Sequence, residues 1–383
     1  MTAVNLVDQV IAHAIECGAS DIHAHCSPEG LTIKLRIDGL LIDDRIISRD
    51  QQDQVVARIK VLAAMNSAER RIPQDGMFRV THTDRVIDIR VSTFPAVLGE
   101  KVVLRILDRA QQPLSLDALG MSDTLKQQFT ELIYRPYGFV LVTGPTGSGK
   151  TTTLYAALTR IATPEKNIIT LEDPVEYQLH DAVQGQINPD AGFTFERGIR
   201  AILRQDPDIA LIGEIRDRET ARIAIEAALT GHIVLSTVHT NDAPGALMRL
   251  MDMGIEPFLI NAALSGIVAQ RLVRKNCTLC TVYEKPTVEE QRVLERLQFK
   301  VECVGKGVGC PACGQSGMRG RIGIFELVRM TNALRAHIVQ HPTFDTIVHQ
   351  AVTDGMVPLL HDGLLKVQSG VISLTELLRA VTI

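Results

Sequence analysis

The sequence predicts an α/β protein in which a small N-terminal α/β domain precedes a core with a mainly parallel sheet, a cysteine-bearing knuckle and a helical tail. The first observation is length, because 383 residues suffice for two or three domains that each bury a core. The second is the alternation of apolar strand-like runs with helical patterns from about 120 to 275, which is typical of βαβ units. The third is the change near 276, where cysteine, glycine and basic residues replace apolar periodicity.

Residues 1–110 are expected to form the small N-terminal domain. Two amphipathic helices are expected in it, over 4–15 and near 50–64. Five strands are expected, at 32–37, 40–46, 77–82, 86–92 and 102–107. The first two strands flank Asp38-Gly39, a pair typical of tight hairpin turns. A polar segment that contains Pro113 predicts a linker, which we place at 111–121.

Three further parts are expected after the linker: a core domain at 122–275, a tetracysteine subdomain at 276–320 and a helical C-terminal subdomain at 321–383. We expect the helical tail to begin after Ile324. Its buried positions are predicted to be Ile338, Ile347, Val348, Leu359, Leu360, Leu364, Leu365, Leu377 and Leu378.

Composition narrows the class of protein. Hydrophobic residues make up 45% and charged residues 22% of the chain, and no segment approaches the roughly 18 uninterrupted apolar residues of a membrane span. We therefore expect a cytoplasmic or peripheral protein. A net charge of −4, no tryptophan and 4% aromatic residues offer little to a phosphate backbone or to stacked bases, so no direct contact with nucleic acid is expected.

The segment Gly144-Pro-Thr-Gly-Ser-Gly-Lys-Thr151 has the spacing of a phosphate-binding loop and predicts ATP binding. Its glycines let successive N–H groups turn toward the β-phosphate, Lys150 is placed to neutralise the β- and γ-phosphates, and Thr151 can ligate Mg²⁺. An apolar strand precedes the loop and a helical pattern follows it, which a merely structural turn does not require. The residues expected to hold the nucleotide are Gly144, Pro145, Thr146, Gly147, Ser148, Gly149, Lys150, Thr151 and Thr152.

Two predicted strands end in a glutamate that suits ATP hydrolysis. The run 209–213 leads into Glu214, which fits the carboxylate that polarises the attacking water. Gly213 stands where many enzymes with this loop carry an aspartate for Mg²⁺, so the metal must depend more on Thr151 and water. The run 167–171 leads into Glu172, the second candidate.

Histidines and arginines supply further candidates. His232 and His239 bracket the strand-like run 233–238, and either is a structural histidine or a sensor of the γ-phosphate, with the polar neighbourhood favouring His239. Arg200 and Arg204 share one face of a predicted helix, where they could stabilise charge on the transferring phosphate. Two more arginines lie on strands of the first domain, where a catalytic role and a surface role with a buried stem both remain open: Arg90 and Arg105.

Two C-x-x-C pairs predict a metal site, formed by Cys277, Cys280, Cys310 and Cys313. Four thiolates favour tetrahedral Zn²⁺ in a structural role. The long segment between the pairs is tolerable because loop closure costs grow slowly with length. A redox pair is the alternative, which is weaker because two matching pairs occur together.

The ordered motifs GPTGSGKTT, ITLEDPVEY, RQDPDIALIGEIRD and LTGHIVLSTVHTN, with ASDIH, PQDG and DIRVSTFPAVLGEKVVLRIL before them, resemble the ATPases of type II secretion and type IV pilus assembly. The resemblance covers nearly the whole chain. It implies a RecA-like ATPase core, a homohexameric ring and an inner-membrane platform protein as partner. It also implies that Glu214 is the catalytic glutamate, with supporting and phosphate-contacting residues at Glu172, His232, His239, Arg90, Arg105, Arg200 and Arg204.

The tetracysteine followed by GMRGRIGIFEL resembles the assembly or export branch of that family rather than the retraction motors. The chain starts almost at the ASDIH segment, so the longer N-terminal docking domain of many members is expected to be missing. A partner would then contact the first domain or the zinc region. Two other functions remain open: a nucleic-acid translocase for DNA uptake or conjugation, and a scaffold that binds nucleotide but hardly hydrolyses it.

Overall fold

The computed structural model describes residues 2–108, 115–340 and 342–381, and it divides into two compact units, Met1–Gln112 and Pro113–Ile383. Residues 111–114 of the expected linker lie outside the described residues. The remainder of that segment includes a short 3₁₀ helix, η2, at Leu116–Leu119. Each unit has its own hydrophobic core.

The first unit is an antiparallel sheet of six strands in the order β3-β2-β1-β6-β5-β4, on which two helices pack. The helices are α1 (Ala3–Glu16) and α2 (Arg49–Leu62). The strands are β1 (Asp21–Ser27), β2 (Gly30–Ile37), β3 (Leu40–Ser48), β4 (Gln74–His82), β5 (Arg85–Phe94) and β6 (Lys101–Leu107). Alternate residues such as Ile87, Ile89 and Val91 are buried, so one face of each strand enters the core.

Sequence patterns predict most of this unit correctly and miss one strand. Asp38 and Gly39 both have positive φ, as the hairpin turn between β2 and β3 requires. The missed strand is β1, whose sequence DIHAHCS is rich in residues with weak strand preference. It nevertheless lies at the centre of the sheet, because Ile22 and Ala24 enter the core and β2 and β6 pair with it on either side.

The second unit contains a seven-stranded sheet in the order β15-β12-β7-β11-β10-β8-β9, parallel except for β15. Its strands are β7 (Gly138–Thr143), β8 (Ile168–Glu172), β9 (Val183–Gln186), β10 (Ile209–Ile212), β11 (Ile233–Val238), β12 (Leu264–Asn276) and β15 (Met318–Arg329). In β7, Phe139 and Leu141 enter one hydrophobic cluster and Val140 and Val142 another, so both faces of the sheet are covered.

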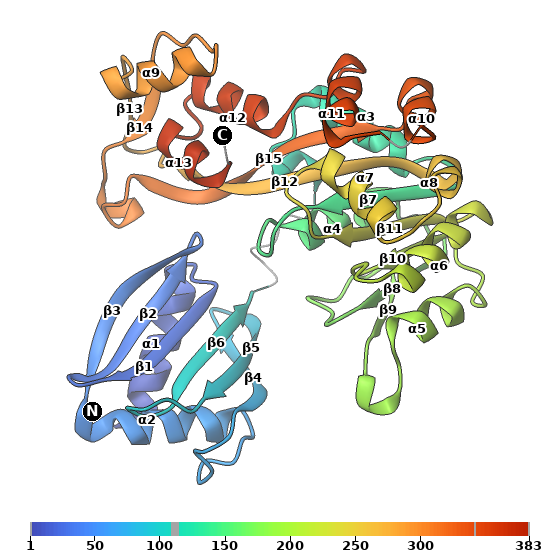
Figure 1. Ribbon diagram of the computed structural model, residues 1–383. Helices are drawn as coiled ribbons and strands as arrows, with labels where there is room; N and C mark the ends of the chain where they lie inside the picture. The colour runs from blue at the N-terminus through green and yellow to red at the C-terminus, as the bar shows by residue number, and fades with distance from the viewer. Residues whose placement is uncertain (1, 109–114, 341, 382–383) are drawn as a thin grey trace. The chain divides into compact units, whose positions relative to one another are not determined.

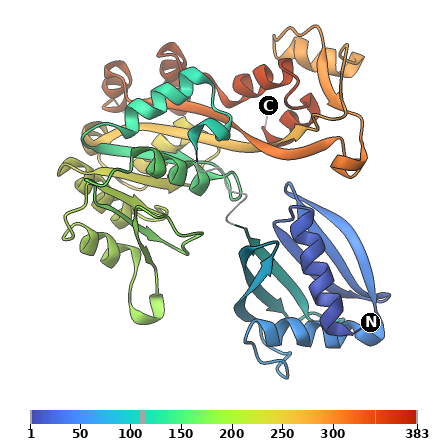
Figure 2. The same ribbon diagram turned by 180° about the vertical axis from the view of Figure 1, so that it is seen from behind.

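Helices lie on both faces of this sheet (Figures 1 and 2). Side chains of α3 (Asp123–Ile133) and α4 (Lys150–Ile161) pack into one cluster. The other cluster receives side chains of α5 (Phe195–Ile202), α6 (Arg218–Leu229), α7 (Ala243–Asp252) and α8 (Pro257–Ala263). This is the α/β fold with a parallel-rich sheet that the sequence predicts. No helix in the described part of the chain has the length and hydropathy needed to cross a bilayer.

The C-terminal part differs from the expectation at its beginning. The helical tail expected after Ile324 begins at Asn332, because 318–329 form β15, which pairs with β12 along most of its length. The tail helices are α10 (Asn332–Ile338), α11 (Phe344–Thr353), α12 (Leu359–Gln368) and α13 (Leu374–Ala380). Of the predicted core positions, Ile338, Ile347 and Leu377 are fully buried, whereas Leu365 is 43% exposed.

The strands β12 and β15 extend beyond the rest of the sheet as a ribbon that carries a small cysteine-bearing module (Figure 1). The module consists of β13 (Thr281–Glu284), α9 (Val288–Arg296), β14 (Val304–Gly307) and the 3₁₀ helix η4 (Pro311–Cys313). The tail helices α12 and α13 pack on β15 and β12, so the ribbon also contributes to the packing of the helical tail.

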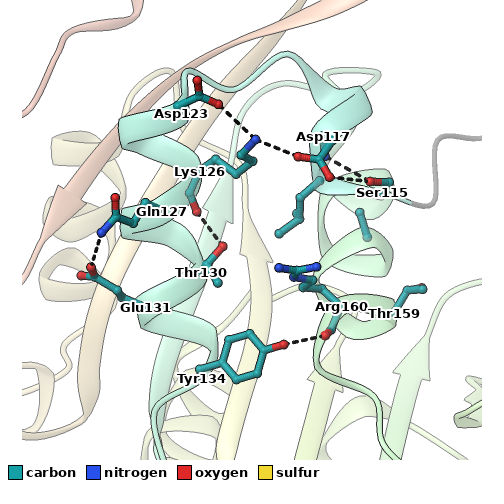
Figure 3. A pocket seen from close by; sticks show the side chains of 12 residues that line it. Ser115, Asp117, Asp123, Lys126, Gln127, Thr130, Glu131, Tyr134, Thr159 and Arg160 are labelled. Carbon is teal, nitrogen blue, oxygen red and sulfur yellow. Dashed lines mark hydrogen bonds and ion pairs between the residues drawn. The ribbon is translucent and has the colours of Figure 1, made fainter.

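A cavity of about 680 Å³ lies between η2, α3 and α4. Figure 3 shows Lys126 between Asp117 and Asp123, with the Tyr134 hydroxyl donating to the Arg160 carbonyl oxygen. The lining residues from α4 come from the half of the helix remote from Lys150. This cavity is therefore separate from the phosphate-binding loop.

Candidate functional site

The phosphate-binding loop connects the buried strand β7 to α4, as the motif requires. Gly144, Gly147 and Gly149 all have positive φ, which residues with a Cβ atom rarely adopt. A Cβ atom on Gly144 would lie only 2.5 Å from both the Gln270 carbonyl oxygen and the Ser148 hydroxyl oxygen. The loop thus needs glycine, and it ends at the N-terminus of α4, where unpaired N–H groups favour an anion.

Lys150 is the first residue of α4, and its ammonium folds over the loop. Its Nζ atom donates to the carbonyl oxygens of Gly144 at 2.8 Å and of Pro145 at 3.2 Å. Burial lowers the pKa of Lys150, the negative charge of Glu214 opposes that shift, and the positive charge of Arg271 adds to it. Glu214 and Arg271 therefore lie within electrostatic range of this ammonium.

Gln270 of β12 supports the phosphate-binding loop through hydrogen bonds. The sequence patterns did not point to this residue. Its side chain is buried, donates from Nε2 to the Ser148 carbonyl oxygen at 2.5 Å, and accepts from the Thr153 hydroxyl at 2.7 Å. The signal in the sequence is a polar residue inside the apolar run 264–273. An amide there has to find partners when buried, so it marks a constrained position.

Glu214 follows β10 and shares its neighbourhood with His239, which follows β11. The Glu214 carboxylate lies 3.4 Å from His239 Nε2 and also pairs with Arg216, and the Glu214 side chain is only 15% exposed. Strands β10 and β11 are parallel neighbours, so both residues lie at the carboxyl edge of the sheet, where β7 leads into the loop. The structure thus brings together Lys150, Glu214 and His239.

Glu172 is held in the interior instead. It is 3% exposed, and its carboxylate accepts from Tyr155, from Thr170 at 2.6 Å and from Gln184 at 3.2 Å. Burial raises the pKa of Tyr155, and the charge of Glu172 and the hydrogen bond to it raise it further. These contacts connect the strand β8 to α4 and β9, so Glu172 supports the elements around the loop.

His232 lies outside this cluster. It precedes β11, at the opposite end of that strand from His239. Its Nδ1 atom lies 2.8 Å from the Ala227 carbonyl oxygen, to which it donates, so it closes the end of α6. A strand of six residues spans roughly 20 Å, so the two histidines that the sequence treats as a pair are separated by the length of β11.

Arg200 lies in the last turn of α5, but Arg204 does not share its helix as the sequence predicts, because α5 ends at Ile202 and Arg204 is in the turn that follows. Among the described residues, neither arginine forms a hydrogen bond or ion pair with Lys150 or Glu214. Arg200 pairs with Glu219 of α6 at 2.7 Å, and Arg204 donates to the Arg200 carbonyl oxygen at 2.6 Å. Both groups are therefore on the surface of this unit.

Arg90 and Arg105 are directly opposite each other on β5 and β6 of the first unit. Asp21 of β1 is the cross-strand neighbour of Arg105 and accepts from its Nε at 3.1 Å. The Asp21 carboxylate is nearly buried, whereas the Arg105 side chain is 62% exposed. The two arginines thus present adjacent positive charges on one face of the sheet.

The four cysteines come together at the end of the β12–β15 ribbon. Their Sγ atoms lie within 4.8 Å of one another, with 3.9 Å for Cys277–Cys310 and for Cys280–Cys313 and 3.7 Å for Cys310–Cys313. Sulfurs bound at about 2.3 Å around a tetrahedral Zn²⁺ would be roughly 3.8 Å apart, so the geometry suits zinc.

Hydrogen bonds favour the thiolate at one of these cysteines. Desolvation raises the pKa of the Cys313 thiol, but the N–H groups of Cys310 and Gly317 donate to its Sγ atom at 3.2 and 3.3 Å and hold that pKa at about 6. Desolvation raises the pKa of Cys280 to about 11. N–H donors directed at a sulfur are suited to a metal-bound thiolate.

Comparisons with known proteins match this architecture. A type II secretion system protein E from Dickeya dadantii is 48% identical over 378 residues, which are 98% of this chain and 75% of that protein. The type IV pilus assembly ATPase PilB from Thermus thermophilus is 45% identical over 98% of this chain and 42% of its own length. The pilus retraction motor PilT, solved with ADP, has a TM-score of 0.65 and 25% identity, with 98% of this chain and 96% of that chain covered.

The ATPase DotB from Legionella pneumophila has a TM-score of 0.73 at 22% identity, with 98% of this chain and 95% of that chain covered, which shows a shared fold. The model of the type II/IV secretion system protein family matches residues 2–379. The phosphate-binding loop and Glu214 lie at the same edge of the sheet, and together with this match they identify the family of the chain. It belongs to the type II/IV secretion system protein family and is an ATPase of that family.

Proposed function

We propose that this ATPase is a homohexameric cytoplasmic motor that drives assembly of a pilus or pseudopilus, and thereby protein secretion, through an inner-membrane platform protein. The observation that carries the proposal is the cluster of Lys150, Glu214 and His239 in a chain so similar to a type II secretion system protein E. Membrane association would come from the platform protein. Closure around ATP would favour one arrangement of domains and product release another.

Each residue of the cluster has a defined chemical task in this proposal. The loop N–H groups of 144–152 and the Lys150 ammonium would hold the β- and γ-phosphates. The hydroxyl of Thr151 would ligate Mg²⁺ together with water, since Gly213 offers no carboxylate. Glu214 would orient the attacking water, with His239 holding its carboxylate in place.

Arginines that lie away from this cluster would complete the site from other parts of the ring. Phosphoryl transfer is accelerated by positive charge placed at the transferring group, often from a neighbouring subunit. Arg90 and Arg105 are directly opposite each other on β5 and β6 of the first unit, and both would contact phosphate in this proposal. Arg200 on α5 and Arg204 in the turn after it are both exposed and would act at the subunit boundary.

Mixing two inactive variants tests whether Arg204 acts in a neighbouring site. We expect Arg204→Ala and Glu214→Gln each to hydrolyse ATP slowly, and their mixture to regain up to about a quarter of the wild-type rate, as random assembly of a ring predicts. The mixture creates interfaces in which an intact Glu214 meets an intact Arg204. Steady-state phosphate release from mixed, re-assembled protein is the measurement, and no gain on mixing would assign Arg204 to its own subunit or to no catalytic role.

The tetracysteine is proposed to hold one structural Zn²⁺. All four side chains belong to one module, and they close the segment from Cys280 to Cys310 that contains β13, α9 and β14. Four thiolates leave no open position for substrate, so the metal would stabilise the module rather than take part in hydrolysis.

Stimulation of ATP hydrolysis tests the proposed function as a whole. Purified full-length chain is assayed with membrane vesicles that contain the platform protein, with vesicles that lack it, and with double-stranded DNA at low and high salt. We expect a rise in hydrolysis only with the platform protein. Stimulation by DNA that falls steeply with salt would instead identify a nucleic-acid translocase, and no stimulation by any of them would contradict motor function.

A further inference from the structure

Arg271 lies beside Gln270 on β12 and contacts a different part of the nucleotide-site edge. Its Nη2 atom donates to the Asn241 carbonyl oxygen at 2.9 Å and to the Asn241 Oδ1 atom at 3.1 Å. Asn241 belongs to the loop between β11 and α7 that also carries His239. Successive residues of a strand point to opposite sides. Gln270 and Arg271 therefore connect one strand to the phosphate-binding loop on one side and to the His239 loop on the other.

The Nη1 atom of the Arg271 guanidinium group is a buried hydrogen-bond donor. Nη1 of Arg271 is shielded from solvent and has no hydrogen-bond partner among the residues that the structure describes. A buried donor without an acceptor destabilises the protein, and more so when it is charged. Such a group is expected to meet an acceptor in a functional state of the protein.

The charges around Arg271 point to an anion as that acceptor. Burial lowers the pKa of Arg271, and the negative charges of Asp242 and Glu326 oppose the shift. Both carboxylates are already engaged with backbone N–H groups, Asp242 with Gly245 at 2.6 Å and Glu326 with Ala243 at 2.7 Å. The Lys150 ammonium is also within electrostatic range, since the charge of Arg271 lowers the pKa of Lys150. Two cations that face the same edge repel each other until an anion arrives between them.

We propose that Arg271 is a phosphate-contacting residue of this ATPase: Nη1 donates to an oxygen of the terminal phosphate while Nη2 holds Asn241. The contact exists with a triphosphate and is lost with a diphosphate. Arg271 therefore reports the state of the nucleotide to the loop that carries His239, and through Glu214 to the hydrolytic cluster. The inference rests on the phosphate-binding loop as the nucleotide site.

A purely structural role for Arg271 makes a different prediction. If Arg271 served only to fix Asn241, its removal would loosen the loop and weaken ATP and ADP alike. If Arg271 instead contacts the terminal phosphate, its removal would weaken the binding of ATP alone. The ratio of the two affinities therefore separates the roles without any measurement of turnover.

The test measures equilibrium binding of a non-hydrolysable ATP analogue and of ADP, each with Mg²⁺, to the full chain by calorimetry. For Arg271→Gln we expect the analogue to bind roughly 10–100-fold more weakly, as loss of a charge-assisted hydrogen bond implies, and ADP to change by less than about threefold. Lys275→Gln is the matched control, because it removes one positive charge from the same strand at its end near Gly320, and it should leave both affinities unchanged.

A second variant keeps the test decisive if Arg271→Gln does not fold. Arg271→Lys retains the charge, but one ammonium cannot reproduce the two-sided fork of arginine, so we expect the preference for the analogue over ADP to fall by about tenfold. Equal weakening of both ligands in either variant, or an unchanged preference, would overturn the assignment. If the wild-type chain bound neither nucleotide, the result would instead contradict the assignment of the phosphate-binding loop as a nucleotide site.

Discussion

Glu214→Gln is expected to lower ATP turnover by about 10²–10³-fold and to leave ATP binding nearly unchanged. The Glu214 carboxylate lies at the carboxyl edge of the sheet, where it contacts His239 and interacts electrostatically with Lys150. Glutamine keeps the size of the side chain and can still donate or accept a hydrogen bond. It removes the negative charge that orients and polarises water, so the loss falls on the chemical step.

Single-turnover hydrolysis and equilibrium nucleotide binding measure the two halves of this prediction separately. Glu226→Gln is a suitable control, since Glu226 lies on the exposed surface of α6 and its carboxylate pairs with Arg222 at 3.6 Å, away from Lys150 and His239. It should hydrolyse ATP at the wild-type rate. Full-rate hydrolysis by Glu214→Gln would remove Glu214 from the catalytic role.

Loss of the proposed zinc is the second large effect. We expect Cys310→Ser to abolish the bound zinc and to lower the Tm by roughly 5–10 °C, since each kcal/mol corresponds to about 2–4 °C in a unit of this size. Cys277 of the same cluster is buried and immediately follows β12, so loosening of the module reaches the ribbon that also carries Gln270. Elemental analysis of reduced protein and thermal unfolding are the measurements.

Cys303→Ser provides the control for that experiment, because Cys303 is exposed and lies outside the cluster. It should retain one zinc per chain and the wild-type Tm. Wild-type protein with much less than one zinc per chain, or Cys310→Ser protein that keeps its zinc, would refute a four-thiolate site.

Local patterns predict the loop and its surroundings well, since the physical requirements of a phosphate-binding loop are local in sequence. Glycines at 144, 147 and 149 adopt positive φ, and a buried strand and a helix flank them as expected. The hairpin at Asp38-Gly39 is predictable for the same reason. The approach of Glu214 to Lys150 follows from a general property of parallel sheets, whose carboxyl ends meet at one edge.

Contacts between segments distant in sequence are what the patterns miss. Residues 318–329 contain apolar side chains that also fit a helix, and they form a strand only because β12 offers an edge to pair with. In the sequence, Gln270 and Arg271 are only two polar residues in an apolar run. Their contacts with Ser148 and Asn241 become evident only in the folded structure. His232 and His239 have similar surroundings in sequence, but the length of β11 separates them.

The most direct test of the central claim, that nucleotide binds in the loop headed by Lys150, is calorimetric titration of ATP with Mg²⁺ into three proteins: the wild type, Lys150→Gln and Lys126→Gln. Lys126 lines the cavity between η2, α3 and α4, which also has volume and charge but is separate from the loop (Figure 3). We predict that Lys150→Gln weakens ATP binding by at least about tenfold, because a direct charge on the phosphates is lost. Lys126→Gln should bind ATP as the wild type does. Normal binding by Lys150→Gln together with lost binding by Lys126→Gln would contradict the account.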